Sequence, residues 1–395
     1  MIPYLRTWFN ENFTPEKYQR FLKELDQRCG THLKFRNSET PIFLPKSLID
    51  KMARYGQELV RQIVDNPGYR EVSQKVIPPE YYSPVEPSRP LFIQADFGLV
   101  RTQDEGYEPQ LVEIQGFPSL YAYQAILPPL HMEIYGLDPK LSCLPGGLLH
   151  DQYLHLLRRA IVGNHNPENV ILMEINPHEQ KTLPDFILTE RLLNVPTVNV
   201  VDIAKKKNRL FYPRQGKWIP IERIYNRVIV DDLVRSGGRL PFRLDEDLDV
   251  EWAGHPNWFF KLSKFSIPFL KHPCVPRSWF LDQIDTLPSD LENYVLKPLF
   301  SFAGRGVKIG LSNEEIATIP PADRCHYILQ EKVPFASTIE TPYGPTKAEI
   351  RIMYIWLEEL LPVNTLVRMG RGKMMGVDHN QNIKWVGGTA AFYEG

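Results

Sequence analysis

The first candidate for chemistry is a lysine beside a glycine-rich loop, between residues 294 and 310. An apolar run ends at Lys297, a loop with Gly304, Arg305 and Gly306 follows, and a second apolar run then returns. Such a pattern predicts a β-hairpin whose loop N–H groups converge on a phosphate, with the ammonium at its edge and the guanidinium above it. Taken alone, the stretch is also compatible with an ordinary solvated hairpin.

A second candidate is a set of oxygen ligands on two expected strands, 91–100 and 110–115. If the strands pair as a hairpin, Asp96 lies opposite Glu113, and Gln115 shares their face because side chains alternate along a strand. Two carboxylates and an amide oxygen are ligands that suit Mg²⁺ or Mn²⁺. The alternative is that they form the polar outer face of an amphipathic hairpin.

The last third of the chain adds polar residues on further expected strands. A short strand at 327–333 ends with Gln330, Glu331 and Val333, and on the next strand Glu349 and Arg351 share a face. The strand after that ends at Arg368. Elsewhere, residues that could contact a substrate, each with a structural role such as a sheet-edge salt bridge as the alternative, are Arg101, Tyr121, Arg223, Tyr225 and Arg227.

The composition excludes several classes of protein. The formal net charge of −1 and the dispersed basic residues give no nucleic-acid footprint. No apolar run is long enough to span a bilayer, and the N-terminus lacks the apolar core of a signal peptide, so we expect a cytoplasmic protein without membrane contact. The four cysteines lack CxxC spacing, which favours reduced thiols.

The elements that must position these residues point to an α/β (α+β) chain of several parts. We expect a helical N-terminal region at 1–88, a metal-binding strand hairpin at 89–140, a Rossmann-like α/β domain at 141–255 and a further domain at 256–395 that carries the lysine hairpin. The α/β expectation rests on an apolar strand from Val170, an amphipathic helix at 179–193 and a β-branched strand from Thr197. A helix is expected over 258–270, and the glycine-rich tail from residue 370 is expected to be mobile.

The order of these motifs resembles the ATP-grasp ligases. A lysine strand, a small-residue loop, a returning strand, a Gln-Glu-x-Val hinge and a Glu-x-Arg strand follow one another at 294–351. The acid strands, with Asp96 and Glu113-Ile-Gln115, precede them. This order is similar to the circularly permuted branch that includes the glutathionylspermidine synthetase-like carboxylate-amine ligases. The resemblance implies an ATP-grasp fold with a Rossmann-like domain before the nucleotide-binding part.

The resemblance also implies roles for individual residues. Lys297 and Lys264, in preference to Lys261, would hold the α- and β-phosphates of ATP, with the loop Gly304–Arg305–Gly306 over the triphosphate. Adenine and ribose would contact Gln330, Glu331 and Val333, one or two Mg²⁺ ions would bind Asp96, Glu113 and Gln115, and Arg351 and Arg368 would stabilise the transferred phosphoryl group. Gln115 departs from the family's asparagine by one methylene, which puts metal geometry in question.

The implied reaction is ATP-dependent formation of an amide bond through an acyl phosphate, with release of ADP and phosphate. Metal ions, Lys and Arg suit this chemistry because negative charge develops on phosphoryl oxygens. The alternatives are a non-catalytic nucleotide-binding or scaffold protein on the same frame and an ATP-dependent phosphotransferase. The substrates, small-molecule or peptide carboxylates and amines, are not identified by the sequence, and neither is the oligomeric state.

Overall fold

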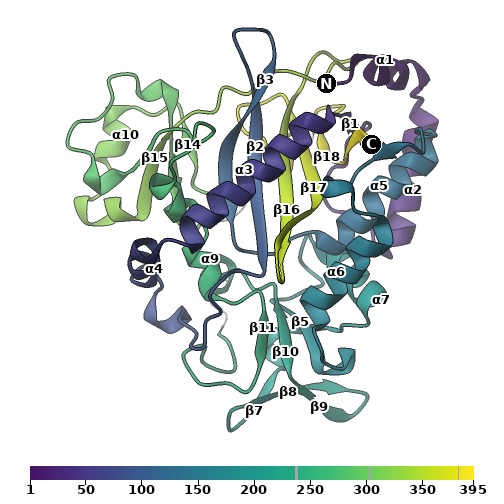
Figure 1. The fold of residues 1–395 in the computed structure, drawn as a ribbon. Coiled ribbons are helices and arrows are strands. Elements are labelled where there is room, and N and C mark those ends of the chain that lie inside the picture. Colours follow the sequence, from purple (N-terminus) through teal and green to yellow (C-terminus); the bar gives the residue numbers. More distant parts are fainter. Residues whose placement is uncertain (236–238, 302–303, 381) are drawn as a thin grey trace.

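A five-stranded antiparallel sheet forms the centre of the computed structural model, which describes residues 1–235, 239–301, 304–380 and 382–395 (Figure 1). Its strands, in spatial order, are β18 (Gly387–Thr389), β17 (Leu360–Gly370), β16 (Lys347–Trp356), β2 (Phe92–Arg101) and β3 (Tyr107–Gln115). The sheet therefore joins the two acid strands to the two arginine strands, which are far apart in sequence.

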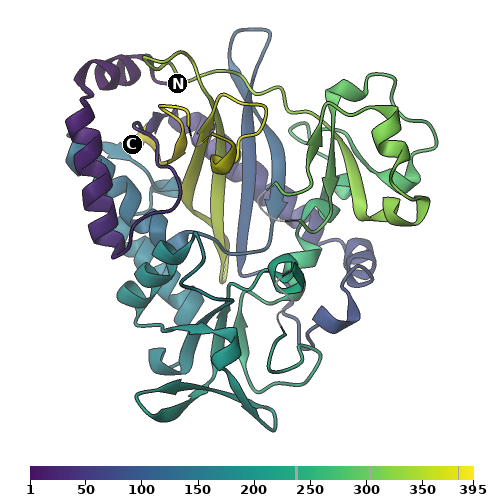
Figure 2. The same cartoon turned by 180° about the vertical axis from the view of Figure 1, so that it is seen from behind.

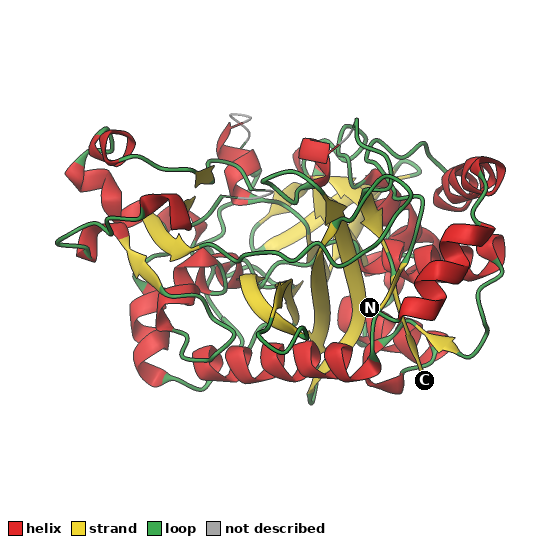
Figure 3. Cartoon of the chain, turned by 90° about the horizontal axis from the view of Figure 1, so that it is seen from above, coloured by secondary structure: helices red, strands yellow, loops and turns green. Residues whose placement is uncertain are grey.

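Alternation of side chains gives this sheet one apolar face and one polar face. On β2, Ala95 and Phe97 belong to the main hydrophobic cluster, whereas Gln94 and Asp96 point the other way. The helix α3 (Lys46–Val64) covers the apolar face with residues such as Met52. Figure 3 shows this long helix along one face of the sheet, with loops over the opposite face.

A smaller antiparallel sheet stands beside the β3 edge and carries the lysine hairpin. Its order is β12 (Ser278–Phe280), β15 (Tyr327–Glu331), β13 (Tyr294–Pro298) and β14 (Lys308–Ile309), with α10 (Asn313–Ala317) on its outer side (Figure 1). The pairing of β13 with β14 confirms the predicted hairpin. Between the two sheets lie α9 (Asn257–Lys261) and a 3₁₀ segment (Lys264–Phe269).

The expected single helix over 258–270 is wrong, because the chain leaves the α-helix after Lys261 and continues as that 3₁₀ segment. Pro268 lacks the N–H that an α-helix needs, and the Ser263 side chain starts the second segment by accepting a hydrogen bond from the Phe265 N–H.

The α/β part contains a parallel sheet in the order β11 (Glu251–Ala253), β10 (Arg223–Asn226), β5 (Val170–Glu174) and β6 (Thr197–Asn199). The predicted strand–helix–strand unit is confirmed, although its helix α7 (Leu183–Leu193) begins four residues later than expected. Its remaining elements are α5 (Tyr121–Tyr135), α6 (His150–Val162), α8 (Val230–Arg235) and a three-stranded sheet of β7 (Ala204–Lys206), β8 (Arg209–Arg214) and β9 (Lys217–Ile221).

The two ends of the chain meet on one side of the molecule (Figures 1 and 2). The last strand, β19 (Ala391–Glu394), lies between β1 (Ile42–Phe43) and β4 (Leu141–Ser142). Helices α1 (Pro3–Asn12) and α2 (Pro15–Cys29) pack nearby, and α4 (Pro67–Gln74) follows α3. The expectation of a mobile tail is therefore wrong for residues 387–394, which are paired in strands and mostly buried. No helix in the described part of the chain is long and apolar enough to cross a membrane.

Candidate active site

The polar face of the central sheet brings the predicted acid residues together. Asp96 pairs with Glu113, as the hairpin pattern predicts, and Gln115 pairs with Gln94 one step along the same face. Nearer the turn the register is shifted by one residue, and a β-bulge at Val112 restores the predicted pairing. The bulge thus places Asp96 and Glu113 on one face.

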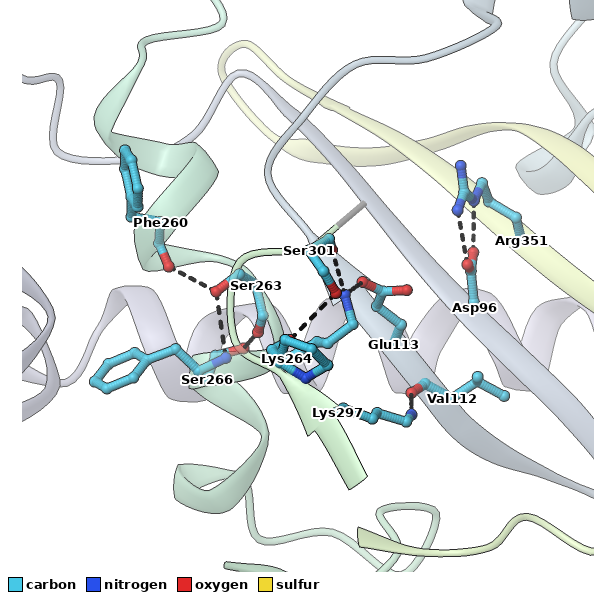
Figure 4. Close-up of polar contacts among 12 residues, drawn as sticks. Asp96, Val112, Glu113, Phe260, Ser263, Lys264, Ser266, Lys297, Ser301 and Arg351 are labelled. Atoms are coloured by element: carbon cyan, nitrogen blue, oxygen red, sulfur yellow. Dashed lines mark hydrogen bonds and ion pairs between the residues drawn. The ribbon is translucent and has the colours of Figure 1, made fainter. Parts of the chain in front are cut away.

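Asp96 is engaged by two arginines from the neighbouring strands. Its carboxylate accepts hydrogen bonds from Nε and Nη2 of Arg351, at 2.5 and 2.7 Å, and another from Arg368 (Figure 4 shows the Arg351 pair). Glu349 also pairs with Arg368, and Gln94 Oε1 accepts from Arg351 Nη1 at 2.6 Å. These five side chains form one buried network across β2, β16 and β17.

The charges in this network shift one another's pKa values. Burial alone would raise the pKa of the Asp96 carboxyl, but Arg351 and Arg368 offset burial and hold that pKa below its usual range. Burial raises the pKa of Glu349 even though Arg368 opposes the shift. For Arg368 itself, burial favours a lower pKa, yet Glu349 and Asp96 raise it. The network therefore consists of two ion-paired guanidiniums and their acids.

Two lysine amines reach the edge strand β3 from the small sheet and the 3₁₀ segment (Figure 4). Lys264 Nζ lies 2.7 Å from a Glu113 carboxylate oxygen and donates to the Ser301 carbonyl at 2.7 Å. Lys297 Nζ donates to the Val112 carbonyl, in the bulge, at 2.9 Å. The preference for Lys264 agrees with this geometry, because Lys261 pairs instead with Glu86, at 2.6 Å.

Lys297 is buried, and burial makes its amine less basic. Burial lowers the pKa of its amine to about 8, even though Glu113 favours the charged form. Lys297 pairs with Ile328 across the small sheet, so its side chain lies on the sheet face that looks toward β3. An anion that entered between the two sheets would meet this amine.

The end of β15 and the hinge that follows it carry an unpaired donor on the same face. Gln330 is buried, and its Nε2 has no hydrogen-bond partner within the described ranges. Glu331 accepts from Arg277 Nε at 2.7 Å. Val333 packs on Gly98 of β2, where a Cβ would come within 2.8 Å of its side chain. The hinge therefore bridges the two sheets and leaves one amide donor for a ligand.

The loop of the lysine hairpin lies close to the segment after β17. A Cβ on Gly304 would lie 3.4 Å from Met374 Cε, and one on Gly306 would lie 2.8 Å from Pro298 Cγ. Both glycines have positive φ angles, of 72° and 70°. Arg305 reaches Asp232 at 3.6 Å, and residues 302–303 of this predicted loop lie outside the described residues.

The residues expected to contact a substrate differ in their surroundings. Tyr121 donates to the carbonyl oxygens of Ile93 and Tyr354, and Arg223 donates to those of Ala160 and Ile161, so both have structural contacts. Arg101 is exposed at the end of β2, over the Tyr107 ring.

Arg227 and Tyr225 belong to a polar cluster at the carboxyl ends of the parallel strands. Arg227 pairs with Asp185 at 3.0 Å and acts on the pKa of Tyr225, although its buried Nε and the buried Tyr225 hydroxyl form no well-aligned hydrogen bond among the described residues. Sequence reasoning missed Glu174, which ends β5, because its strand reads as a plain apolar run. Burial raises the pKa of Glu174 to about 7, although Arg227 opposes the shift. The carboxyl ends of parallel strands are where open α/β sheets bind ligands.

The candidate site combines buried donors with two acids of unequal exposure. Two buried amines and the unpaired Gln330 donor suit an anionic, hydrogen-bonding ligand. In the described part of the chain, no three His, Cys, Asp or Glu side chains are placed to share a metal ion, which does not bear on a set that includes the Gln115 amide. Glu113, with a side chain 25% exposed, fits the common arrangement in which one carboxylate and substrate phosphates share Mg²⁺, whereas Asp96 is 1% exposed.

Comparison with known proteins supports the fold and little more. No protein-family model matches the sequence, and no curated protein matches it. Among solved structures, the chain is similar to a glutathione synthetase-like effector from Globodera pallida, solved in its apo form. The TM-score is 0.58 at 13% sequence identity, over 96% of this chain and 99% of that chain. The two proteins therefore share a fold over nearly their whole lengths.

Proposed function

We propose that this protein is an ATP-dependent carboxylate–amine ligase of the ATP-grasp type, with a circularly permuted order of elements. The observation that carries the proposal is the convergence of Lys264 and Lys297 on the bulged edge strand at Glu113, between two sheets. A purely structural cluster would not explain two buried amines beside an unpaired amide donor, because burying such groups is costly.

In this proposal, the chain's own residues bind the nucleotide between the two sheets. Lys264 and Lys297 hold the α- and β-phosphates, the glycine loop covers the triphosphate, and Gln330 donates to the edge of the base, with Glu331 and Val333 beside it. Mg²⁺ or Mn²⁺ bound with ATP would neutralise phosphate charge, and Glu113 and Gln115 are the residues that would hold it.

The arginines of the central sheet then act on the phosphoryl group that is transferred. Arg368, more exposed than Arg351, offers N–H donors to phosphoryl oxygens as a carboxylate attacks the γ-phosphorus of ATP and ADP leaves. An amine then attacks the acyl carbon of the resulting acyl phosphate, which gives an amide and releases phosphate and a proton. The loop at 304–306 and the segment near Met374 exclude water, which would otherwise hydrolyse the acyl phosphate.

The polar cluster in the α/β part would supply a place for one of the two substrates. Glu174, Arg227 and Tyr225 lie at the carboxyl ends of adjacent parallel strands, where the Arg227 Nε and the Tyr225 hydroxyl form no well-aligned hydrogen bond among the described residues. A compound that carries both a carboxylate and an amine matches this mixture of acid, guanidinium and hydroxyl.

The test is ATP binding followed by turnover. Calorimetry with ATP and Mg²⁺ should detect binding to the wild type, and Lys297→Met should weaken it by about tenfold or more, because a charged hydrogen bond is lost. Lys308→Met is the matched control, because Lys308 is exposed on β14, the partner strand of the same hairpin. It pairs with Leu296, whose side chain packs in the hydrophobic cluster on the other face of the small sheet.

Turnover then separates the proposed ligase from the two alternatives. ADP release that requires both a carboxylate and an amine supports the ligase. Turnover with one acceptor and a stable phosphorylated product would identify a phosphotransferase, and binding without any turnover would identify a scaffold. Equal ATP affinity in the wild type and Lys297→Met would reject the proposed nucleotide site.

A further inference from the structure

The two acids that face each other on β2 and β3 have different surroundings. Asp96 is 1% exposed, and both of its oxygens accept hydrogen bonds from guanidiniums. Glu113 is 25% exposed and pairs with a single amine, that of Lys264. A pair of metal ligands would be expected to share access to the same space.

A divalent cation at Asp96 would have to displace the guanidiniums. The Arg351 pair is bidentate, and Arg351 is also fixed by Gln94 Oε1. Displacement would leave two buried guanidiniums beside a new dication and remove their shared counter-ion. Breaking a buried pair in this way is strongly unfavourable.

We infer that Asp96 is a positioning residue: it fixes the Arg351 and Arg368 guanidiniums on the cleft face of the sheet and does not bind a divalent cation. The role given to the arginines rests on the proposed function. The geometry of the pairs is independent of it. Gln94 extends the network, because its Nε2 donates to the Ser119 carbonyl at 2.8 Å, at the loop that enters α5. Arg351 is thereby fixed from two sides, and Arg368 is held between Asp96 and Glu349.

The sign of the change in anion affinity in Asp96→Asn distinguishes a positioning role of Asp96 from a simple charge effect. Asp96→Asn removes a negative charge next to two cations, so electrostatics alone predicts tighter binding of an anion. If Asp96 instead sets the orientation of the guanidiniums, anion binding weakens despite the added positive charge. ATP in the presence of EDTA is a suitable probe, since its γ-phosphate is the group assigned to the arginines and no metal takes part.

The experiment compares Asp96→Asn with Glu113→Gln, the same chemical change at the other acid. For Asp96→Asn we expect ATP affinity in EDTA to fall roughly tenfold, as for loss of a charged hydrogen bond. The factor by which Mn²⁺ strengthens ATP binding should stay within about twofold of wild type, because no metal ligand is lost. For Glu113→Gln, most of the Mn²⁺ enhancement should disappear.

Loss of the Mn²⁺ enhancement in Asp96→Asn, with ATP affinity in EDTA unchanged or improved, would overturn the inference. If Asp96→Asn does not fold, Arg351→Lys keeps the charge but breaks the bidentate pair and should give the same pattern. If the wild type binds no ATP, the proposed function fails. Direct Mn²⁺ titration, monitored by electron paramagnetic resonance, then decides the inference, since an effect of Asp96→Asn on Mn²⁺ binding contradicts it and equal binding supports it.

Discussion

The Lys297 amine is buried at a position where the proposed function needs a positive charge to bind phosphate. Its amine lies between the two sheets, where burial lowers its pKa to about 8. A lysine with a depressed pKa destabilises the folded state while it is charged, and this penalty decreases as pH rises from about 8 to its unfolded value of about 10.4. An incoming phosphate would stabilise the charged form instead. Protonation of Lys297 and nucleotide binding should therefore be coupled.

The first prediction is that nucleotide affinity falls with pH above about 8, up to tenfold per unit, as Lys297 loses its proton. Calorimetry in two buffers with different ionisation enthalpies should detect proton uptake on binding at pH 8.5. Lys297→Arg stays charged throughout this range and should give neither the slope nor the uptake. The same slope in Lys297→Arg would assign the effect to another group.

The two strand pairs that carry the site differ in how far sequence could predict them. The pairing of Asp96 with Glu113 follows from symmetry about a polar turn, but the bulge at Val112 does not, because no glycine or proline marks it. The bulge matters, since its carbonyl accepts from Lys297. The arginines on β16 and β17 were assigned to the phosphoryl group, but their pairing with Asp96 depends on a strand contact across about 250 residues, which local patterns do not encode.

Helix α3 determines how the sheet presents its polar face, because it occupies the opposite face. At the contact, Gly56 lies against Tyr354 of β16, and a Cβ on Gly56 would lie 2.0 Å from the Tyr354 hydroxyl oxygen. That hydroxyl donates to the Ala53 carbonyl at 2.9 Å. Glycine at this position is thus required for close approach of the helix to the sheet.

The second prediction is that Gly56→Ala lowers the free energy of unfolding by about 1–3 kcal/mol, the usual cost of overpacking. Urea denaturation monitored by circular dichroism measures it. The double variant Gly56→Ala/Tyr354→Phe should lose less than the sum of the single variants, because the hydroxyl that collides with the new methyl group is gone. Additive losses would place the effect elsewhere on the helix.

At the scale of the whole molecule, the candidate site depends on contacts between distant segments. Lys297 ties the small sheet to the bulge in β3, and the chain on either side of the 3₁₀ segment is tied there by backbone bonds from Leu111 to Cys274 and from Gly116 to Leu262. Beyond it, Asp185 of α7 accepts from the Leu120 and Tyr123 N–H groups at the start of α5, and Arg227 holds Asp185. The α/β part thereby fixes the loop whose Ser119 carbonyl contacts Gln94.

The last strand, β19, also joins segments that are distant in the sequence, and this gives the third prediction. Phe392 of β19 is fully buried against Phe43 of β1, so Phe392→Ala should lower the free energy of unfolding by about 3–5 kcal/mol, as in other buried aromatic truncations. Glu394→Ala, exposed on the same strand, should change it by only about 0.5 kcal/mol. Urea denaturation measures both variants.

Because β19 pairs with both β1 and β4, hydrogen exchange in Phe392→Ala should speed up in those strands before it does so in β13. Equal stability of the two variants would mean that the last strand is only loosely attached, as the glycine-rich sequence before it had suggested.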